Sequence, residues 1–148
     1  MNRRSPIGPA AVLALLWTCS PLAAADFQAG VARAKITPPT PFWMSGYAAR
    51  AHPSEGVEQD LWAKALALRD GEDHLAVLVT TDLIGLPRAI SDEVAERVRE
   101  GFRVERPQLV LSASHTHCGP AVRKNLAVLY DFGEEDRRRV DAYGTLLV

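Results

Sequence analysis

The sequence predicts an α/β fold: a mixed sheet that contains a right-handed βαβ unit. Three segments carry this prediction. Residues 75–81 (LAVLVTT) form a near-continuous apolar strand, residues 88–100 an amphipathic helix, and residues 109–112 (LVLS) a second apolar strand. Connections between parallel strands through a helix are almost always right-handed. Both strands are apolar on both faces, so each needs covering layers on both sides, but only one clear helix precedes the histidine motif. We therefore expect one face of the sheet to be poorly covered and at least one strand edge to be open.

Two further strands precede this unit. Residues 28–36 (QAGVARAKI) form a short strand that Thr37-Pro38-Pro39 ends, and residues 61–69 (LWAKALALR) form another, followed by the hairpin turn Asp70-Gly71. The loop between them carries Trp43, Met44 and Tyr47, which either pack beneath the loop or form a platform for a substrate.

The helix has clear limits in the sequence. Pro87 fits its first turn, Ile90, Val94 and Val98 lie on one face, and Gly101 stands where a helix commonly stops. A second helix is expected to begin near Glu134.

Composition excludes several classes of protein. The 148 residues include 17 Lys+Arg and 18 Asp+Glu, and 47% are hydrophobic. These values are typical of one globular domain and exclude a disordered or collagen-like chain. The net charge of −1 leaves no basic surplus for phosphates, so we expect no nucleic-acid partner.

Residues 1–25 are predicted to be a cleaved signal peptide. Arg3 and Arg4 are followed by an apolar run over residues 10–17 and by small residues at 23–25. That run is shorter than the roughly 20 residues of a transmembrane helix, so no transmembrane segment is expected after removal. We therefore expect an exported protein, periplasmic or secreted. Cys118 is then the sole cysteine, either a plain small residue or a reactive thiol.

Chemistry is expected where the two strands of the βαβ unit end, because ligands gather beyond the carboxyl ends of parallel strands. The first strand leads to Asp82 and the second into SASHTHCGP (112–120). If the strand continues through them, His115 and His117 point the same way and suit zinc; a pair of surface histidines is the alternative. Asp82 is a candidate for orienting an imidazole, or a turn residue.

The remaining candidates are weaker. His52 and His74 lie in polar, turn-like segments and are expected at the surface. Cys118 follows His117 directly, and adjacent strand residues face opposite ways, so they make a poor nucleophile–base pair. No nucleophile elbow, His-Glu-x-x-His helix, phosphate loop or dinucleotide fingerprint occurs in the sequence.

Five motifs in order resemble the N-terminal part of the neutral/alkaline non-lysosomal ceramidases, including their shorter bacterial relatives. They are GVARAKITPP (30–39), MSGYA (44–48), LWAKALALRDG (61–71), LAVLVTTDLIGL (75–86) and, most specifically, SASHTHCGP (112–120).

The resemblance implies a zinc-dependent amide hydrolase acting on a lipid-like N-acyl substrate, with ceramide cleaved to sphingosine and fatty acid as the known case. It implies that His115 is a zinc ligand and that His117 is catalytic and helps to polarise the substrate amide. Two departures from the family pattern are Cys118 in place of a serine and Lys35 where an aspartate is frequent.

The family's remaining zinc ligands are a later histidine, a glutamate and a tyrosine. No histidine follows Pro120, and the sequence ends in the apolar stretch 143–148. We therefore expect residues 26–148 to be the truncated N-terminal part of a larger α/β catalytic domain, inactive alone. The alternatives are another His-x-His metallohydrolase, a secreted non-catalytic binding module, or a product that does not fold stably.

Overall fold

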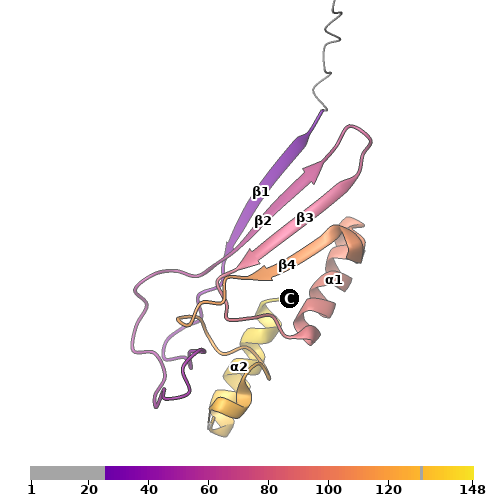
Figure 1. The fold of residues 1–148 in the computed structure, drawn as a ribbon. Helices are drawn as coiled ribbons and strands as arrows, with labels where there is room; N and C mark the ends of the chain where they lie inside the picture. Colours follow the sequence, from indigo (N-terminus) through magenta and orange to yellow (C-terminus); the bar gives the residue numbers. More distant parts are fainter. Residues whose placement is uncertain (1–25, 131) are drawn as a thin grey trace, which may run out of the picture.

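A single mixed sheet organises the chain in the computed structural model, which describes residues 26–130 and 132–148. The strands lie in the order β1 (Gln28–Lys35), β2 (Trp62–Arg69), β3 (Leu75–Thr81) and β4 (Leu109–Ala113) (Figure 1). β2 is antiparallel to both β1 and β3, whereas β3 and β4 are parallel. The predicted α/β class with its βαβ unit is confirmed. The signal-peptide prediction for residues 1–25 lies outside the described residues.

The β2–β3 hairpin forms at the predicted turn. The Asp70 N–H donates to the carbonyl of His74 at 3.1 Å. One carboxylate oxygen of Asp70 accepts the backbone N–H groups of Glu72 and His74, each at 2.9 Å. An aspartate that satisfies the backbone in this way favours a tight turn, which explains why the local sequence identified it.

The helix α1 (Arg88–Phe102) joins β3 to β4 and begins after Pro87, as predicted. It runs through Gly101, so the predicted stop at that glycine is wrong. Arg103 ends the helix instead, in the left-handed conformation (φ 58°), and its N–H donates to the carbonyl of Arg99 at 3.0 Å. The capping hydrogen bond and the exposed side chain let a residue other than glycine take this role.

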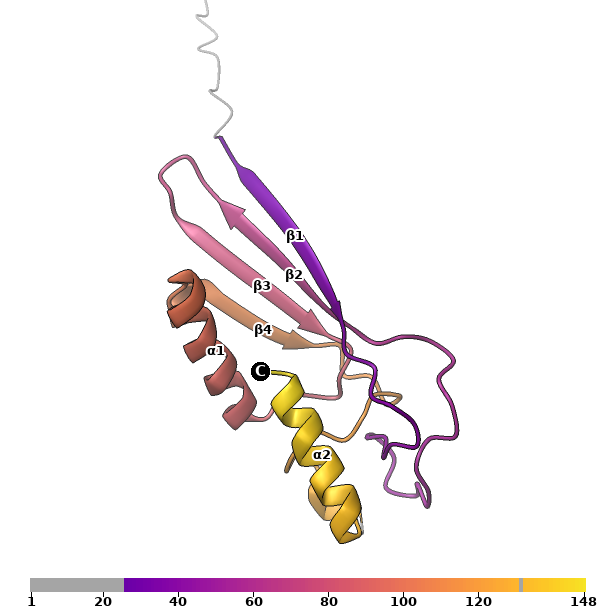
Figure 2. The ribbon, with the colours of Figure 1, turned by 180° about the vertical axis from the view of Figure 1, so that it is seen from behind.

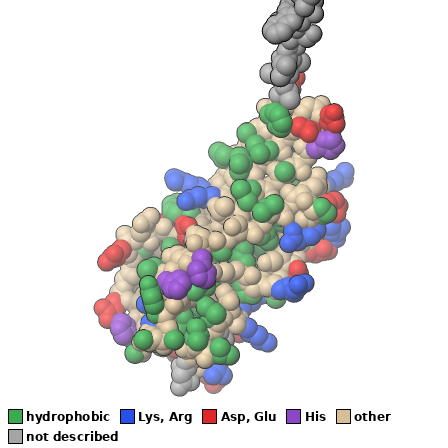
Figure 3. All heavy atoms as spheres, in the orientation of Figure 1, with side chains coloured by type: hydrophobic (Ala, Val, Ile, Leu, Met, Phe, Trp, Pro, Cys, Tyr) green, Lys and Arg blue, Asp and Glu red, His purple; other side chains and the backbone are tan. Residues whose placement is uncertain are grey.

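One face of the sheet is covered by α1. Apolar residues of the helix pack on alternate residues of β3 and β4, a cluster of Val94, Ala95, Val98, Leu75, Val77, Val79, Leu109 and Leu111. The opposite face is open: Val31 is 83% exposed and Val110 is 54% exposed. Figure 3 shows hydrophobic side chains gathered over the strands. Because α1 covers only one face, β3 and β4 are not buried on both faces among the described residues, and the expectation of one poorly covered face is confirmed.

The main core lies beyond the carboxyl ends of β3 and β4, where α2 (Glu134–Leu146) packs on the loops (Figures 1 and 2). Tyr143 of α2 donates its hydroxyl to the carbonyl of Ile36 at 2.6 Å, and burial raises the pKa of Tyr143. Trp43 packs against Tyr130 and Phe132, with ring centroids 6.2 Å and 5.5 Å away. Of the two interpretations of Trp43, packing beneath the loop is therefore correct.

Two 3₁₀ turns, η1 (Arg106–Gln108) and η2 (Ala127–Leu129), complete the secondary structure of the described residues. Among residues 26–130 and 132–148, no helix has both the length and the apolar character needed to cross a bilayer.

Candidate functional site

The histidine motif forms a loop, not a strand. β4 ends at Ala113, and His115 adopts the left-handed conformation with φ 58°. The condition under which strand periodicity would align the two histidines, a strand that continues through them, is therefore not met. The two imidazoles nevertheless meet: the Nε2 atoms of His115 and His117 lie 3.4 Å apart, and the ring planes cross at 71°. The turn of the loop, rather than strand periodicity, brings them together.

His115 is oriented by a backbone carbonyl. Its Nδ1 atom lies 2.8 Å from the carbonyl oxygen of Ile84, in the segment that follows β3. Because a carbonyl only accepts hydrogen bonds, Nδ1 carries the proton in this contact. The lone pair of the neutral ring is then on Nε2, the atom that faces His117. A histidine held in this way is prepared to bind a metal ion through Nε2.

His117 is held by the loop that contains the MSGYA motif. The Tyr47 ring lies edge-on to its imidazole, with centroids 5.1 Å apart. Gly46, with φ 110°, lies so close that a Cβ atom there would be 2.6 Å from the Cβ of His117. Only a glycine fits at this position, both for its backbone angle and for the space.

Hydrogen bonds join the two loops next to this contact. The Ser45 N–H donates to the carbonyl of Gly119 at 2.7 Å, and the Ser45 hydroxyl to that of Pro120 at 2.9 Å. The Gly46 N–H donates to the hydroxyl of Tyr130 at 2.8 Å. Ser45 is fully buried, so these bonds are shielded from water. Motifs some 75 residues apart in sequence thus form one structural unit.

Asp82 does not contact the imidazoles through any hydrogen bond of the described residues. Its Oδ2 atom accepts the backbone N–H of Trp62 at 2.9 Å and so ties the end of β3 to the start of β2. The contact that orients His115 comes instead from Ile84, two residues later. A backbone carbonyl leaves no signature in residue type, which is why sequence reasoning turned to the nearest carboxylate.

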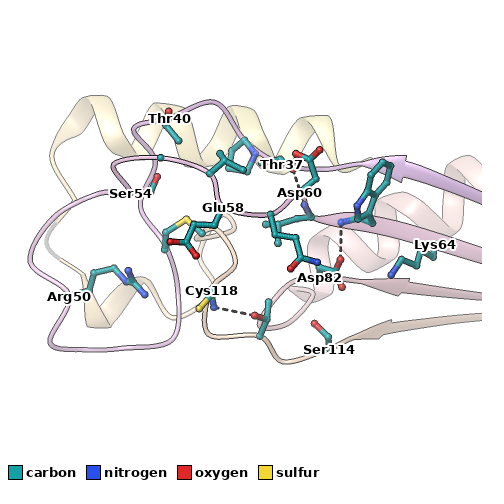
Figure 4. Close-up of a pocket in the computed structure, with 18 residues that line it drawn as sticks. Thr37, Thr40, Arg50, Ser54, Glu58, Asp60, Lys64, Asp82, Ser114 and Cys118 are labelled. Atoms are coloured by element: carbon teal, nitrogen blue, oxygen red, sulfur yellow. Dashed lines mark hydrogen bonds between the residues drawn. The ribbon is translucent and has the colours of Figure 1, made fainter.

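A pocket of about 720 Å³ lies beside the histidine loop (Figure 4). Ser114, Thr116 and Cys118 of the loop line it, whereas His115 and His117 do not. Successive residues of the loop therefore alternate between lining the pocket and forming the imidazole pair. Its remaining walls come from the loop between β1 and β2, from the first residues of β2 and from Asp82.

The charged side chains that line this pocket differ in how completely they are paired. Asp60 pairs with Lys35 at 2.8 Å and accepts the Thr37 hydroxyl at 3.0 Å. These two hydrogen bonds, Lys35 first, hold the pKa of Asp60 below its usual range. Arg50 also lines the pocket and donates from Nη2 to the carbonyl of His117 at 3.3 Å.

Sequence reasoning missed Arg50. The available signal was that Arg50 is the only Asp, Glu, Lys or Arg residue between Ile36 and Ser54. A single charge in an otherwise uncharged loop indicates a specific partner for that charge.

The other candidate residues lie at the surface. The side chains of His52 and His74 are 70% and 72% exposed, which confirms their predicted places. Cys118 is a free, exposed thiol in the turn after the histidines, where its N–H donates to the Thr116 hydroxyl at 3.1 Å. The premise of strand alternation at Cys118 is wrong, because the segment is not a strand.

The imidazole pair can be tested against the geometry of zinc. Two nitrogen ligands at about 2.0–2.1 Å from a tetrahedral zinc ion lie about 3.4 Å from one another. The observed separation of the Nε2 atoms, 3.4 Å, matches this value. Among residues 26–130 and 132–148, no group of three or more His, Cys, Asp or Glu residues is placed to hold a metal ion. The described residues thus bring two imidazole nitrogens close together but do not complete a metal site.

Comparison with solved structures gives the same overall arrangement. The chain superposes on the crystal structure of neutral ceramidase from Pseudomonas aeruginosa, and on a ceramidase complexed with C2, with a TM-score of 0.63 and 23% identity in both cases. Each match covers 77% of this chain and 19% of the solved chain, so the chain spans about a fifth of their length. At this identity the likeness shows the fold alone. No curated protein matches the chain.

The comparison with protein families is more specific. The family described as neutral/alkaline non-lysosomal ceramidase, N-terminal, matches residues 27–134. This range includes the sheet, α1 and the loops that hold both histidines. The chain belongs to the neutral/alkaline non-lysosomal ceramidase family.

Proposed function

We propose that this chain supplies part of the active site of a zinc-dependent hydrolase that cleaves the amide bond of a lipid-like N-acyl substrate, ceramide being the case that the family suggests. The observation that carries the proposal is the imidazole pair: the carbonyl of Ile84 orients His115, and the Nε2 atom of His115 lies 3.4 Å from that of His117, so one ring can hold a metal ion while the other lies next to it.

His115 is the residue that holds the metal in this proposal. Its Nδ1 proton is engaged by the carbonyl of Ile84, so its Nε2 lone pair faces outward in a fixed direction. Zinc, when bound, supplies an acidified water molecule as nucleophile at neutral pH. Zinc sites in hydrolases commonly have three protein ligands, so further ligands come from outside the described residues.

His117 serves the substrate. Its imidazole lies next to that of His115, and Gly46 and Tyr47 fix the ring from the other side. A donor at this position stabilises negative charge that develops on the carbonyl oxygen of the amide, an effect typically of about 3 kcal/mol. The chain by itself is inactive, because His115 alone does not complete a three-ligand site. Export through a signal peptide at residues 1–25 forms part of the proposal.

Zinc titration into the purified chain tests the proposal. We expect His115→Ala to weaken zinc binding, measured by calorimetry, while His74→Ala, in the exposed β2–β3 turn, leaves it unchanged. Hydrolysis of N-acylsphingosine by the isolated chain should be absent.

Two results decide against it. Zinc affinity that is equal in the wild type and His115→Ala would favour a secreted binding module in which the histidines are incidental. Turnover of an N-acyl substrate by the isolated chain would contradict the incomplete site.

A further inference from the structure

Arg50 stands out as an incompletely paired cation at the pocket beside the histidine loop. Its Nε atom is buried without any hydrogen-bond partner in the described part of the chain. The guanidinium makes one long hydrogen bond, 3.3 Å, to the carbonyl of His117, and its Cζ atom lies 5.7 Å from the Tyr47 ring centroid. No ion pair within residues 26–130 and 132–148 neutralises it. A partly buried guanidinium with so few partners gains from an anion at its open side.

The pocket has the size and lining of a small-molecule site. Its volume of about 720 Å³ lies within the range of roughly 300–1,000 Å³ that is usual for ligand pockets. Met44, Val57, Leu61 and Trp62 give it apolar wall, and Arg50 points into it next to Cys118 (Figure 4). A ligand that fits therefore has an apolar part and one negative group.

The other charged residues at the pocket favour a ligand that carries a single negative charge. Asp60 is paired with Lys35, and Asp82 is engaged by the Trp62 N–H, but Glu58 is exposed and unpaired among the described residues. Lys64, the other cation of the lining, lies at the opposite end of the pocket from Arg50 (Figure 4), so one cation faces a ligand head group at Arg50. These carboxylates oppose a dianion such as phosphate more than a monoanion, because repulsion grows with charge. A carboxylate also matches the planar fork of an arginine.

We propose that this pocket binds an amphipathic monocarboxylate, with its carboxylate on the guanidinium of Arg50 and its apolar part along Met44, Leu61 and Trp62. The inference goes beyond the proposed hydrolysis, because binding here requires neither zinc nor either imidazole. Arg50 also holds the carbonyl of His117, so a ligand at this point lies against the backbone of the histidine loop.

Calorimetric titration of the 148-residue chain with matched probes tests the site. One pair is octanoate and octanamide, and the other is N-octanoylglycine and its amide; within each pair only the charge of the head group changes. We expect each carboxylate to bind more tightly than its amide, by about tenfold for the preferred pair. The pair with the larger preference distinguishes a free fatty acid from an N-acyl amino acid.

Variants locate the preference. Arg50→Gln should abolish the difference between carboxylate and amide, and Arg50→Lys, which keeps the charge but not the fork, should retain a reduced difference. Arg138→Gln, an exposed arginine on α2 away from the pocket lining, should behave as the wild type. Thermal melts confirm that each variant is folded; if Arg50→Gln does not fold, the comparison of Arg50→Lys with the wild type decides.

Three outcomes overturn the proposal. In the first, the wild type binds carboxylate and amide with equal affinity; in the second, it binds no probe at all. In the third, Arg50→Lys shows the same preference for the carboxylate as the wild type. The readout involves no zinc and no turnover, so it fails or succeeds independently of the proposed hydrolase.

Discussion

Gly46 and His117 are in direct van der Waals contact, and the contact leaves no room for a side chain on Gly46. A Cβ atom at this position would lie 2.6 Å from both Cβ and Cγ of His117 and 2.7 Å from its Cα. Because Gly46 also has a φ of 110°, it cannot move to a conformation that suits alanine without shifting the loop. The position of the His117 ring therefore depends on a glycine 71 residues earlier in the chain.

The first prediction follows from this contact. Gly46→Ala should lower the free energy of unfolding by at least about 2 kcal/mol, from backbone strain and overpacking together. The matched control is Gly30→Ala in β1, where an added Cβ meets nothing within 4 Å. Chemical denaturation measures both variants, and similar stability for the two would contradict the role of the contact.

The second prediction concerns the two histidines. His115→Ala should reduce zinc affinity about tenfold more than His117→Ala does, because the carbonyl of Ile84 orients only His115. Calorimetric titration of zinc into each variant measures the difference. Equal retention of metal by the two variants would refute the assignment of separate roles.

The third prediction concerns Cys118. In a polypeptide that carries the remaining zinc ligands, Cys118→Ser should keep hydrolysis within a few-fold of the wild type, because Cys118 lines the pocket and not the imidazole pair. Steady-state kinetics on an N-acyl substrate measure it. Complete loss of turnover, with zinc content unchanged, would instead establish the thiol as nucleophile.

The fourth prediction concerns the open face of the sheet. Every residue of β1 is exposed, so the chain presents both an unpaired strand edge and an apolar face. We expect residues 26–148 to self-associate or to be only partly folded, since open edges promote strand pairing between molecules.

Light scattering and a thermal melt measure this behaviour. Val31→Lys should reduce association, whereas Val128→Lys should not, although Val128 is still more exposed, at 94%, because it lies outside the sheet. A wild-type chain that is monodisperse at all concentrations and melts cooperatively would disprove the prediction.

The fifth prediction concerns the link between α2 and the end of β1. Tyr143→Phe removes the buried hydrogen bond to the carbonyl of Ile36 and should lower stability by about 1–2 kcal/mol. Tyr47→Phe is the control, because Tyr47 is 55% exposed and its hydroxyl has no hydrogen bond in the described part of the chain. Denaturant midpoints compare the two; equal midpoints would show that the bond adds nothing.

The sequence by itself determined the elements with strong local signals. The strand at Leu75–Thr81 is predicted by its short, near-continuous apolar run, and the turn at Asp70 by its turn chemistry, both of which are local properties of the sequence. The histidine motif was also recognisable, since residue type and short spacing are properties of the sequence alone.

Only the tertiary structure decided how the site is assembled. The orientation of His115 comes from the carbonyl of Ile84, and the position of His117 from Gly46 in a distant loop. The position of Arg50 likewise results from packing between segments far apart in the chain. The same holds for the sheet, where α1 covers one face and leaves the opposite face exposed. Backbone carbonyls and close approaches of loops leave no periodic pattern in the sequence, because the free energy that fixes them comes from contacts formed only when the chain has folded.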